Sequence, residues 1–591
     1  MHRRDLYFLS KYRLKAKKEI VKRWLDKCPS LFGIVKTDKQ TSFFDGRIVQ
    51  TNYQLLNTLP LTKVDIESFL SESRKYYDDI QLHPEVMAFY LNYNYYKDVE
   101  EIDEKDDEES EENTFNFDNL PHVYQDKFKI VSKLLGLNED FPKTNLYRDF
   151  RSNVRSTLYD KLKKGKVLVR GTNATIFSNG YEMLLYIINK LNDKYKPILK
   201  DNEVFSYFFN EGEELCLGRS PHITMGNVYY AKNVKEPEPI KKYFVLSKEI
   251  IYFNSINNNV MNRLNDCDFD SDSLLITNDS HLVNAAKKVY QNFKVPVNGL
   301  PSSAKDLDLY KIDYNISSNK IGQIVNFSQL LNSIYWDSST RENVNINREE
   351  LYKDICILSI LSGVEIDKAK RDYDVNVPEV IKKLKEKYLK GFYETNRPFF
   401  FNHRILDILS SSTKKIENVP FSTTMDYICD AAKNKAFVQR KREGTVSFQD
   451  LVNHSSNTNL SSYNRKKVKE SRDIIEKYYI EYNKICAKYK GDDTFNQRKD
   501  DWLCRLLKDF EDYLTNNDCI YKLLSSIDTK DMIKYFWIIL YFIFNRDKNN
   551  ANFYKQVFKE KTDNLYKLVI DDDAINPDFE YYGIKLVKEK V

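Results

Sequence analysis

The sequence predicts an α+β protein in which a compact β-rich module lies between mostly helical regions. Between residues 167 and 277, short runs rich in β-branched and aromatic residues are bounded by turn residues, a pattern typical of strands. Before residue 162 and after residue 312, apolar residues recur at helical spacing instead. A chain of 591 residues is also too long for one hydrophobic core, so several domains are expected.

The N-terminal region, residues 1–97, is predicted to be mostly helical. Thr62 and Asp65 have the spacing of a capping box, and apolar residues follow them at helical intervals. Met1–Arg23 is rich in Lys and Arg and has no uninterrupted apolar stretch. It is therefore expected to be neither a signal peptide nor a membrane anchor.

An acidic run interrupts the helical pattern. Asp98–Glu112 contains eleven acidic residues and one lysine, so its local charge is −10. We expect residues 98–116 to form a solvated, disordered loop, with a helical connector at 117–162. Because the formal net charge of the whole chain is +5, the remainder carries about +15. That basic remainder suits a protein that binds a phosphate backbone, although solubility alone also explains it.

The β-rich module is assigned to residues 163–300. It begins with the turn signal Lys163-Lys-Gly-Lys166. The short runs predicted as strands are residues 166–170, 243–246, 250–253 and 274–277.

The rest of the chain is predicted to be helical, in a region at 301–415 and a C-terminal domain at 416–591. A Ser/Asn/Thr-rich stretch at 453–464 is expected to form a surface loop. The most apolar run, Tyr535–Phe544, is about half the length that spans a bilayer, so we expect a buried helix and no membrane. Eight cysteines without a C-x-x-C pair favour reduced thiols in a cytoplasmic protein over disulfides or structural zinc.

Four aspartates alternate in the segment 265–276, between apolar strand-like runs: Asp266, Asp268, Asp270 and Asp272. Carboxylates this close repel one another unless a cation neutralises them. In a tight turn, alternate residues present their oxygens on one side, which suits octahedral magnesium.

Two other interpretations of the cluster are an acidic surface turn and a helix-loop-helix calcium site. A calcium loop that starts at Asp266 or Asp268 has serine where glycine is required. It also has Thr277 or Asp279 where the bidentate glutamate belongs. Since the flanking residues favour strands over helices, this type of calcium site is not expected.

Four further segments occur in a fixed order around the aspartates. Arg219 to Gly226 reads R-x-P-x-x-x-x-G, and the four segments are residues 167–184, 218–228, 319–326 and 363–368. The first two, together with the aspartates, resemble the metal-binding barrel of double-psi β-barrel RNA polymerases. That superfamily includes the largest subunit of cellular RNA polymerases, the RNA-dependent RNA polymerases of gene silencing and phage-type relatives. The last two are similar to segments that follow the metal loop in the RNA-dependent RNA polymerases of gene silencing. The resemblance covers some 200 of the 591 residues.

The resemblance implies a central six-stranded double-psi β-barrel flanked by helical domains. It places Asp268, Asp270 and Asp272 on the three metal-binding aspartates of a loop that reads N-A-D-F-D-G-D in the family. The ion expected there is Mg²⁺, with Mn²⁺ as a substitute. The implied reaction is transfer of nucleotides from NTPs to an RNA 3′-end, on an RNA or DNA template, by a two-metal mechanism.

Three further residues are candidates for substrate binding. Arg219 matches an arginine that lies near the nucleotide in the family, while a salt bridge that braces the barrel is an equally good interpretation. His222 either contacts substrate or caps a turn. Lys320 either faces a nucleic acid backbone or is a solvated helix lysine.

Two departures from the family leave other functions open. Ser271 replaces a glycine of the metal loop, and residues 1–165 show no sign of the first of the two barrels that active polymerases use. We therefore expect a partner polypeptide or a longer parent protein to supply that barrel. A nucleic-acid-binding scaffold that retains an inactive barrel is the alternative. A metal-dependent nuclease ranks last, because no His or Lys adjoins the aspartates in sequence.

Overall fold

The structure, a computed structural model, describes the larger part of the chain. It covers residues 43–94, 122–192, 195–269, 272–304, 320–342, 344–368, 371–404, 416–433, 446–452, 462–489, 558–561 and 565–590, with isolated positions between 498 and 523. All of these residues belong to one compact unit, Thr41–Val591.

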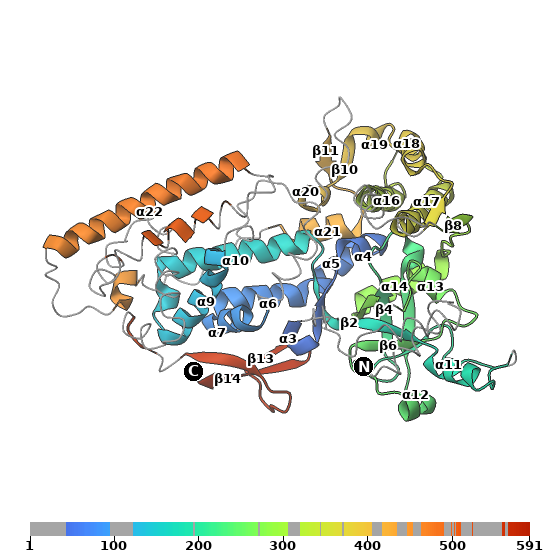
Figure 1. Ribbon diagram of the computed structural model, residues 1–591, viewed down its shortest axis with the longest axis horizontal. Helices are drawn as coiled ribbons and strands as arrows, with labels where there is room; N and C mark the ends of the chain where they lie inside the picture. Colours follow the sequence, from blue (N-terminus) through green and yellow to red (C-terminus); the bar gives the residue numbers. More distant parts are fainter. Residues whose placement is uncertain are drawn as a thin grey trace, which may run out of the picture. The chain divides into compact units, whose positions relative to one another are not determined.

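Six strands in the middle of the chain close into a barrel (Figure 1). The hydrogen-bonded order is β2-β6-β3-β5-β4-β7, and β7 pairs again with β2, which closes the ring. The β2·β6 and β3·β5 pairs are parallel and the other four are antiparallel. The strands are β2 (Leu168–Ser178), β3 (Glu203–Phe205), β4 (Glu214–Gly218), β5 (Tyr229–Asn233), β6 (Ile250–Phe253) and β7 (Ser273–Thr277). The predicted α+β fold with a central six-stranded double-psi barrel is confirmed.

The barrel has its own apolar core, built by side-chain alternation along the strands. Every second residue points inward, as the period of a β-strand requires. The buried inward residues include Ala174, Ile176, Leu215, Leu217, Ile251, Phe253, Leu274 and Ile276. Gly171 allows β2 and β7 to approach closely, because a Cβ there would lie 2.2 Å from the carbonyl oxygen of Ile276.

Short helices connect the barrel strands. They are α11 (Gly180–Ile187), η4 (Met225–Asn227), α12 (Glu238–Tyr243) and α13 (Val260–Arg263). α14 (Ser280–Asn292) follows β7 and packs on β4 and β5. Asp279 caps its N-terminus by accepting hydrogen bonds from the amides of His281 and Leu282.

The region before the barrel is helical, with one short strand. Its elements are α3 (Phe43–Gly46), β1 (Ile48–Gln50), α4 (Tyr53–Thr58), α5 (Lys63–Phe69), α6 (Ser71–Leu82), α7 (Pro84–Phe89), η1 (Tyr90–Asn94), α9 (His122–Leu137), η3 (Phe141–Lys143) and α10 (Asn145–Lys163). The capping box of Thr62 and Asp65 is present and begins α5, as predicted. Gly165 forms the predicted turn into the barrel with a φ of +78°.

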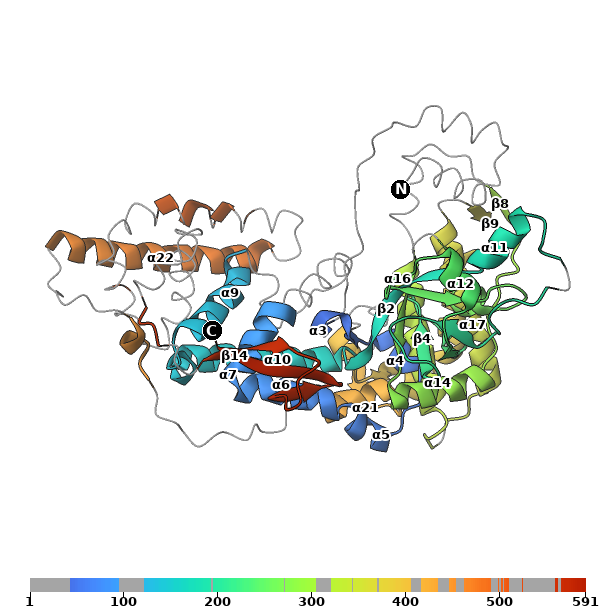
Figure 2. The same ribbon diagram turned by 90° about the horizontal axis from the view of Figure 1, so that it is seen from below.

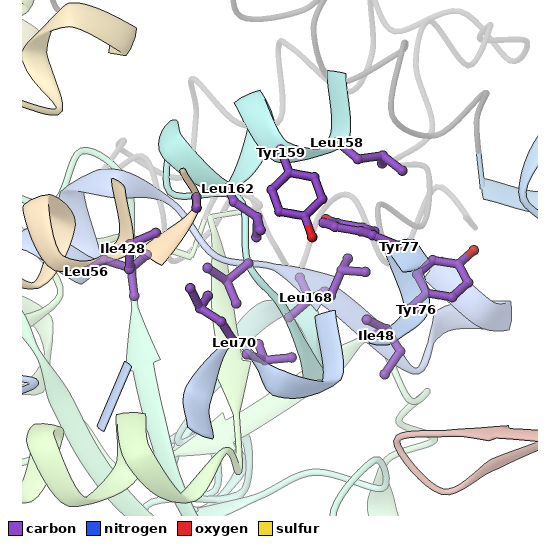
Figure 3. Close-up of a cluster of buried hydrophobic side chains, with 14 of the residues drawn as sticks. Ile48, Leu56, Leu70, Tyr76, Tyr77, Leu158, Tyr159, Leu162, Leu168 and Ile428 are labelled. Carbon is purple, nitrogen blue, oxygen red and sulfur yellow. The ribbon is translucent and has the colours of Figure 1, made fainter. Parts of the chain in front are cut away.

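A hydrophobic cluster joins this helical region to the barrel. β1 pairs antiparallel with the first residues of β2, so that Ile48 lies opposite Arg170. Figure 3 shows Ile48 and Leu168 from these two strands among side chains from α4, α6, α10 and α21 (Thr424–Ala431). The labelled members are Ile48, Leu56, Leu70, Tyr76, Tyr77, Leu158, Tyr159, Leu162, Leu168 and Ile428.

Two long helices follow the barrel, α16 (Ile321–Asp337) and α17 (Arg348–Asp367), and they pack against each other. α16 is buried along most of its length, and its polar side chains satisfy the backbone of the segment after β4. Gln329 donates to the carbonyl of His222 at 3.0 Å and Asn332 donates to that of Ile223 at 2.7 Å. The elements that remain before residue 452 are β8 (Ser302–Ala304), β9 (Arg371–Tyr373), α18 (Val377–Tyr388), α19 (Phe392–Thr395), β10 (Asn396–Pro398), α20 (Phe401–Arg404), β11 (Glu417–Val419) and η5 (Phe448–Leu451).

The C-terminal region differs from the uniformly helical domain expected at 416–591. It contains the long helix α22 (Ser462–Tyr489), but its last residues form an antiparallel sheet in the order β12-β14-β13. These strands are β12 (Tyr566–Ile570), β13 (Phe579–Tyr581) and β14 (Ile584–Lys590). Buried Leu568 and Leu586 alternate with more exposed neighbours, which is the period of a strand.

The predicted strand at 243–246 is also wrong, because Tyr243 ends α12 and the following residues have no regular structure. Predictions for residues 98–116, 453–461 and 535–544 lie outside the described residues. The last three residues of the loop expected at 453–464 belong to α22 instead. The helices that the structure describes include none that is both long and apolar enough to cross a bilayer.

Candidate active site

The carboxylate loop, residues 264–272, leads from α13 into β7. Asn265 and Asp266 both adopt left-handed backbone conformations, with φ of 59° and 53°. Asn and Asp tolerate this conformation better than other residues with a Cβ. The two residues turn the chain just before Asp268, and Asp272 directly precedes β7.

Arg219 joins the R-x-P segment to this loop. It follows β4, whose last residue, Gly218, pairs with Leu275 of β7, so Arg219 emerges beside the start of β7. Its guanidinium donates to the carbonyl oxygen of Asn265 at 3.0 Å and to Oδ1 of Asp272 at 2.9 Å. The side chains of Arg219 and Asp272 are only 17% and 19% exposed. In this arrangement Arg219 holds the carboxylate loop in place through its salt bridge with Asp272, which is one of the two roles expected for it.

The two described aspartates of the proposed triad are close in space. The amide of Asp268 donates to Oδ2 of Asp272 at 2.8 Å, so the Asp272 carboxylate reaches back across the turn. The side chain of Asp268 is exposed. Asp270 and Ser271 lie outside the described residues. Over the part of the chain that is described, no three His, Cys, Asp or Glu residues are grouped as a metal site.

The chemistry of these donors fits a hard divalent cation. Asp268 offers an exposed carboxylate. Both oxygens of Asp272 already accept an N–H, but each carboxylate oxygen has a second lone pair. Mg²⁺ is held by one or two protein carboxylates together with water and substrate phosphates. Asp272 therefore serves as a ligand if it shares its Oδ1 with Arg219 or exchanges Arg219 for the ion.

Asn265 holds the turn in place from two sides. Its Nδ2 donates to the carbonyl oxygen of Pro221 at 3.0 Å, and its Oδ1 accepts from Ser359 of α17 at 3.2 Å. Arg219 also donates to the carbonyl of Asn265, so the R-x-P segment, the carboxylate loop and α17 meet at this residue. Sequence reasoning missed Asn265 and Ser359. The only available signal was that an asparagine tolerates the left-handed conformation at the start of an acidic turn.

Asp266 is held apart from the Arg219–Asp272 pair. Its Oδ1 accepts from Asn262 at 3.0 Å, and its Oδ2 lies close to Gly363 of α17. Partial loss of solvent raises the pKa of this carboxyl above its ordinary value, and the nearby Asp367 carboxylate adds to the rise.

His222 lies in the interior, with 1% of its surface exposed. Its Nε2 is 3.0 Å from Oγ1 of Thr58, and its amide donates to Oε1 of Gln54 at 2.9 Å. Burial lowers the pKa of His222 to about 3, so the imidazole is neutral at ordinary pH. The structure thus assigns His222 to packing between the R-x-P segment and α4, and does not bring it to the carboxylate loop as a substrate contact.

Lys320 precedes α16, and its amide donates to Oε2 of Glu365 at 2.9 Å. The ammonium of Lys368 lies 3.5 Å from the same carboxylate. Both lysines therefore lie where the N-terminus of α16 meets the C-terminal end of α17, the helix that contacts Asn265 through Ser359.

The glycine of the R-x-P-x-x-x-x-G segment has a packing role. A Cβ on Gly226 would lie 2.2 Å from the carbonyl oxygen of Lys294 and 2.5 Å from the hydroxyl of Tyr352. Buried Arg263 donates to the carbonyl of Gly226 at 3.0 Å, and its guanidinium lies 4.2 Å from the ring centre of Tyr290. These contacts fix the segment that carries Arg219 against α13, from which the carboxylate loop starts.

Comparisons with known proteins add a structural likeness. No protein-family model matches the sequence, and no curated protein matches it. Among solved structures, the chain is similar to an RNA-dependent RNA polymerase, QDE-1 from Thielavia terrestris, with a TM-score of 0.46 and 12% sequence identity. The likeness covers 86% of this chain and 58% of that one, so it spans less than two thirds of that polymerase. The closed six-stranded barrel fits the double-psi barrel superfamily that the sequence motifs resemble.

Proposed function

We propose that the chain catalyses nucleotidyl transfer, as an RNA polymerase or as the catalytic half of one. In this reaction the 3′-oxygen of an RNA attacks the α-phosphorus of an NTP. The RNA gains one nucleotide, pyrophosphate leaves, and the 3′-hydroxyl proton is released to a base or to water. The template is RNA or DNA.

The observation that carries the proposal is the meeting of Arg219 with Asp272 at one end of a closed barrel. The two residues are 53 positions apart, and each belongs to a motif that the sequence shares with double-psi barrel polymerases. The pairing of β4 with β7 brings them together, and the Asp268 amide adds the second aspartate of the triad to the same point. A carboxylate cluster beside a fixed guanidinium is suited to binding metal and phosphate together.

Each group has a distinct task in this proposal. Asp268, Asp270 and Asp272 would hold Mg²⁺, which when bound supplies a Lewis acid for in-line displacement. Arg219 orients Asp272 and keeps positive charge beside the position where phosphate charge develops. Asn265 and Ser359 keep the loop in its turned conformation, so that Asp268 and Asp272 stay on the same side.

Incorporation of labelled NTPs on single-stranded RNA and DNA templates, with Mg²⁺ or Mn²⁺, tests the proposal. Asp268→Asn removes the charge of an exposed side chain, so it is expected to abolish incorporation and leave the fold intact. Asp374→Asn is the matched control, since Asp374 is exposed and lies outside the carboxylate loop. Incorporation that is equal in the wild type and in Asp268→Asn would falsify the assignment of the metal site.

A second candidate function is nucleic-acid binding by an inactive barrel, with catalysis on another chain. The observation in its favour is that residues 43–94 and 122–163, as far as they are described, are helical apart from β1 and contain no second barrel. The first barrel would then come from a partner polypeptide or a longer parent protein. This function predicts salt-sensitive binding of RNA or DNA that persists in Asp268→Asn, without metal-dependent synthesis under any condition.

A further inference from the structure

Helix α11 buries its charged residue and exposes apolar side chains, the reverse of an ordinary surface helix. Its one charged residue, Glu182, is buried and accepts hydrogen bonds from the amide of Ile198 at 3.0 Å and the hydroxyl of Tyr252 at 3.1 Å. The next six residues, Met183 to Ile188, are all apolar, yet none of them is fully buried. Tyr186 and Ile188 are 62% and 57% exposed. A soluble surface helix normally buries its apolar face and exposes its charges, so this apolar face is available to a partner.

Helix α12 extends the same surface with aromatic rings. α11 and α12 pack against each other outside β6 (Figures 1 and 2). The rings of Tyr181 and Tyr243 are stacked, with centroids 5.8 Å apart and planes 21° from parallel. Tyr243 is 54% exposed, and the ammonium of Lys242 lies 5.3 Å from its ring centre. Gly180 permits this packing, because a Cβ there would lie 2.3 Å from the ring of Phe177.

Lysines are in excess in the segments that adjoin α11 and α12. The described residues 188–192, 195–202 and 235–249 contain seven exposed lysines but only three exposed acidic residues, Asp201, Glu238 and Glu249. Only one of these lysines, Lys200, forms an ion pair with a nearby acid, Glu203. The lysines are Lys190, Lys196, Lys200, Lys235, Lys241, Lys242 and Lys248. The segments that adjoin the exposed aromatic rings therefore carry an excess of positive charge, and Lys242 lies directly beside Tyr243.

The geometry points to α11 and α12 as a binding platform for single-stranded RNA. Bases stack on exposed aromatic rings irrespective of their sequence, and lysines beside the rings attract the phosphates. A partner protein would need only the apolar side chains, whereas the lysine excess in the adjoining segments complements a polyanion. The platform begins where β2 ends, and Ser178 at that end pairs with Phe253, the residue that precedes the segment leading to the carboxylate loop. This inference rests on the proposed function in one respect, that the RNA bound here is the substrate or product strand.

Binding of a fluorescent oligouridylate of roughly a dozen nucleotides to the full chain tests the platform. All proteins carry Asp268→Asn, so that the measured affinity does not depend on synthesis. The double variant Tyr186→Ala/Tyr243→Ala is expected to weaken binding about 5- to 150-fold per lost stacked base. Tyr186→Phe/Tyr243→Phe keeps both rings and is expected to retain the affinity. Lys241→Gln/Lys242→Gln is expected to reduce the slope of log affinity against log salt concentration by about 1.4.

Matched controls separate this result from general charge effects. Lys382→Gln/Lys383→Gln removes two exposed lysines from α18 and is expected to leave the affinity unchanged. Equal affinity in the alanine and phenylalanine double variants overturns the platform and leaves the apolar face as a protein contact. An equal loss of RNA affinity in the α18 control and in the Lys241→Gln/Lys242→Gln variant also overturns the platform. The platform and the proposed function fail separately, since the first concerns RNA affinity and the second concerns incorporation by the chain with Asp268 intact.

Discussion

Replacement of Arg219 by alanine is expected to loosen the carboxylate loop. Arg219 donates two hydrogen bonds, to the Asn265 carbonyl and to Asp272, and both members of the ion pair are largely covered. Hydrogen bonds to charged groups contribute about 1.5–3 kcal/mol each, and loss of one partner of a buried pair costs about 3–5 kcal/mol. Because both side chains keep some contact with solvent, we expect a loss of about 2–4 kcal/mol of local stability.

Hydrogen exchange of a peptide that covers the loop measures this loss. The amide of Asp268 is protected by Asp272, whose orientation depends on Arg219. A loss of about 2–4 kcal/mol corresponds to exchange that is about 30- to 900-fold faster. Arg465→Ala on α22 is the control and should leave the loop peptide unchanged. Mg²⁺ should restore protection in Arg219→Ala, because Oδ1 of Asp272 is then free to bind the ion while Oδ2 still accepts from the Asp268 amide. If Arg219→Ala accelerates this exchange less than threefold, Arg219 does not hold the loop in place.

Three further variants test the packing around the loop. His222 has its pKa lowered to about 3, below the ordinary value of 6.5, so the stability it contributes is complete above pH 6.5 and declines as the pH falls toward 3. The decline reaches about 2 kcal/mol at pH 5. His222→Gln should therefore show a smaller drop in Tm between pH 7 and pH 5 than the wild type, and an equal drop contradicts the burial of a neutral His222. Gly226→Ala should lower Tm through about 1–3 kcal/mol of overpacking, whereas Gly299→Ala, which has open space around it, should not; equal Tm values in the two variants rule out the packing argument. Asn265→Gly should be less destabilising than Asn265→Ala by about 1 kcal/mol in thermal unfolding, because glycine adopts φ of 59° without strain; the reverse order contradicts the role given to the left-handed turn.

Much of the barrel was predictable from local sequence. β6 and β7 consist of apolar runs rich in β-branched or aromatic residues, and the start of β2 is similar. β3 was missed because it has only three residues, and β4 and β5 were missed because Glu214 and Lys232 leave each with a short apolar run. Such strands depend on pairing across the barrel more than on local preference. The predicted strand at 243–246 failed because Phe244 and Leu246 pack in the apolar cluster that contains Tyr252 of β6 instead of joining the sheet.

The motifs of the site were predictable from the sequence, but the contacts between them were not. The aspartates and the R-x-P segment were recognisable, yet nothing local indicates that Arg219 bonds to Asp272 or that Asn265 contacts α17. Those contacts follow from the closure of the barrel and the packing of α17 beside it. The burial of His222 was hidden for a similar reason, since its partners, Thr58 and Gln329, are more than 100 residues away in both directions.

The most direct test of the central claim is to locate the metal by iron-directed cleavage of the backbone. Fe²⁺ bound in place of Mg²⁺ generates hydroxyl radicals that cut the chain close to the ion. Cuts are expected near residues 265–273 and, because Arg219 contacts Asp272, near 218–221. Mg²⁺ should compete for the site and suppress both cuts, and Asp268→Asn should abolish them. Cuts that fall elsewhere, or that persist unchanged in Asp268→Asn, would contradict a catalytic metal in the carboxylate loop.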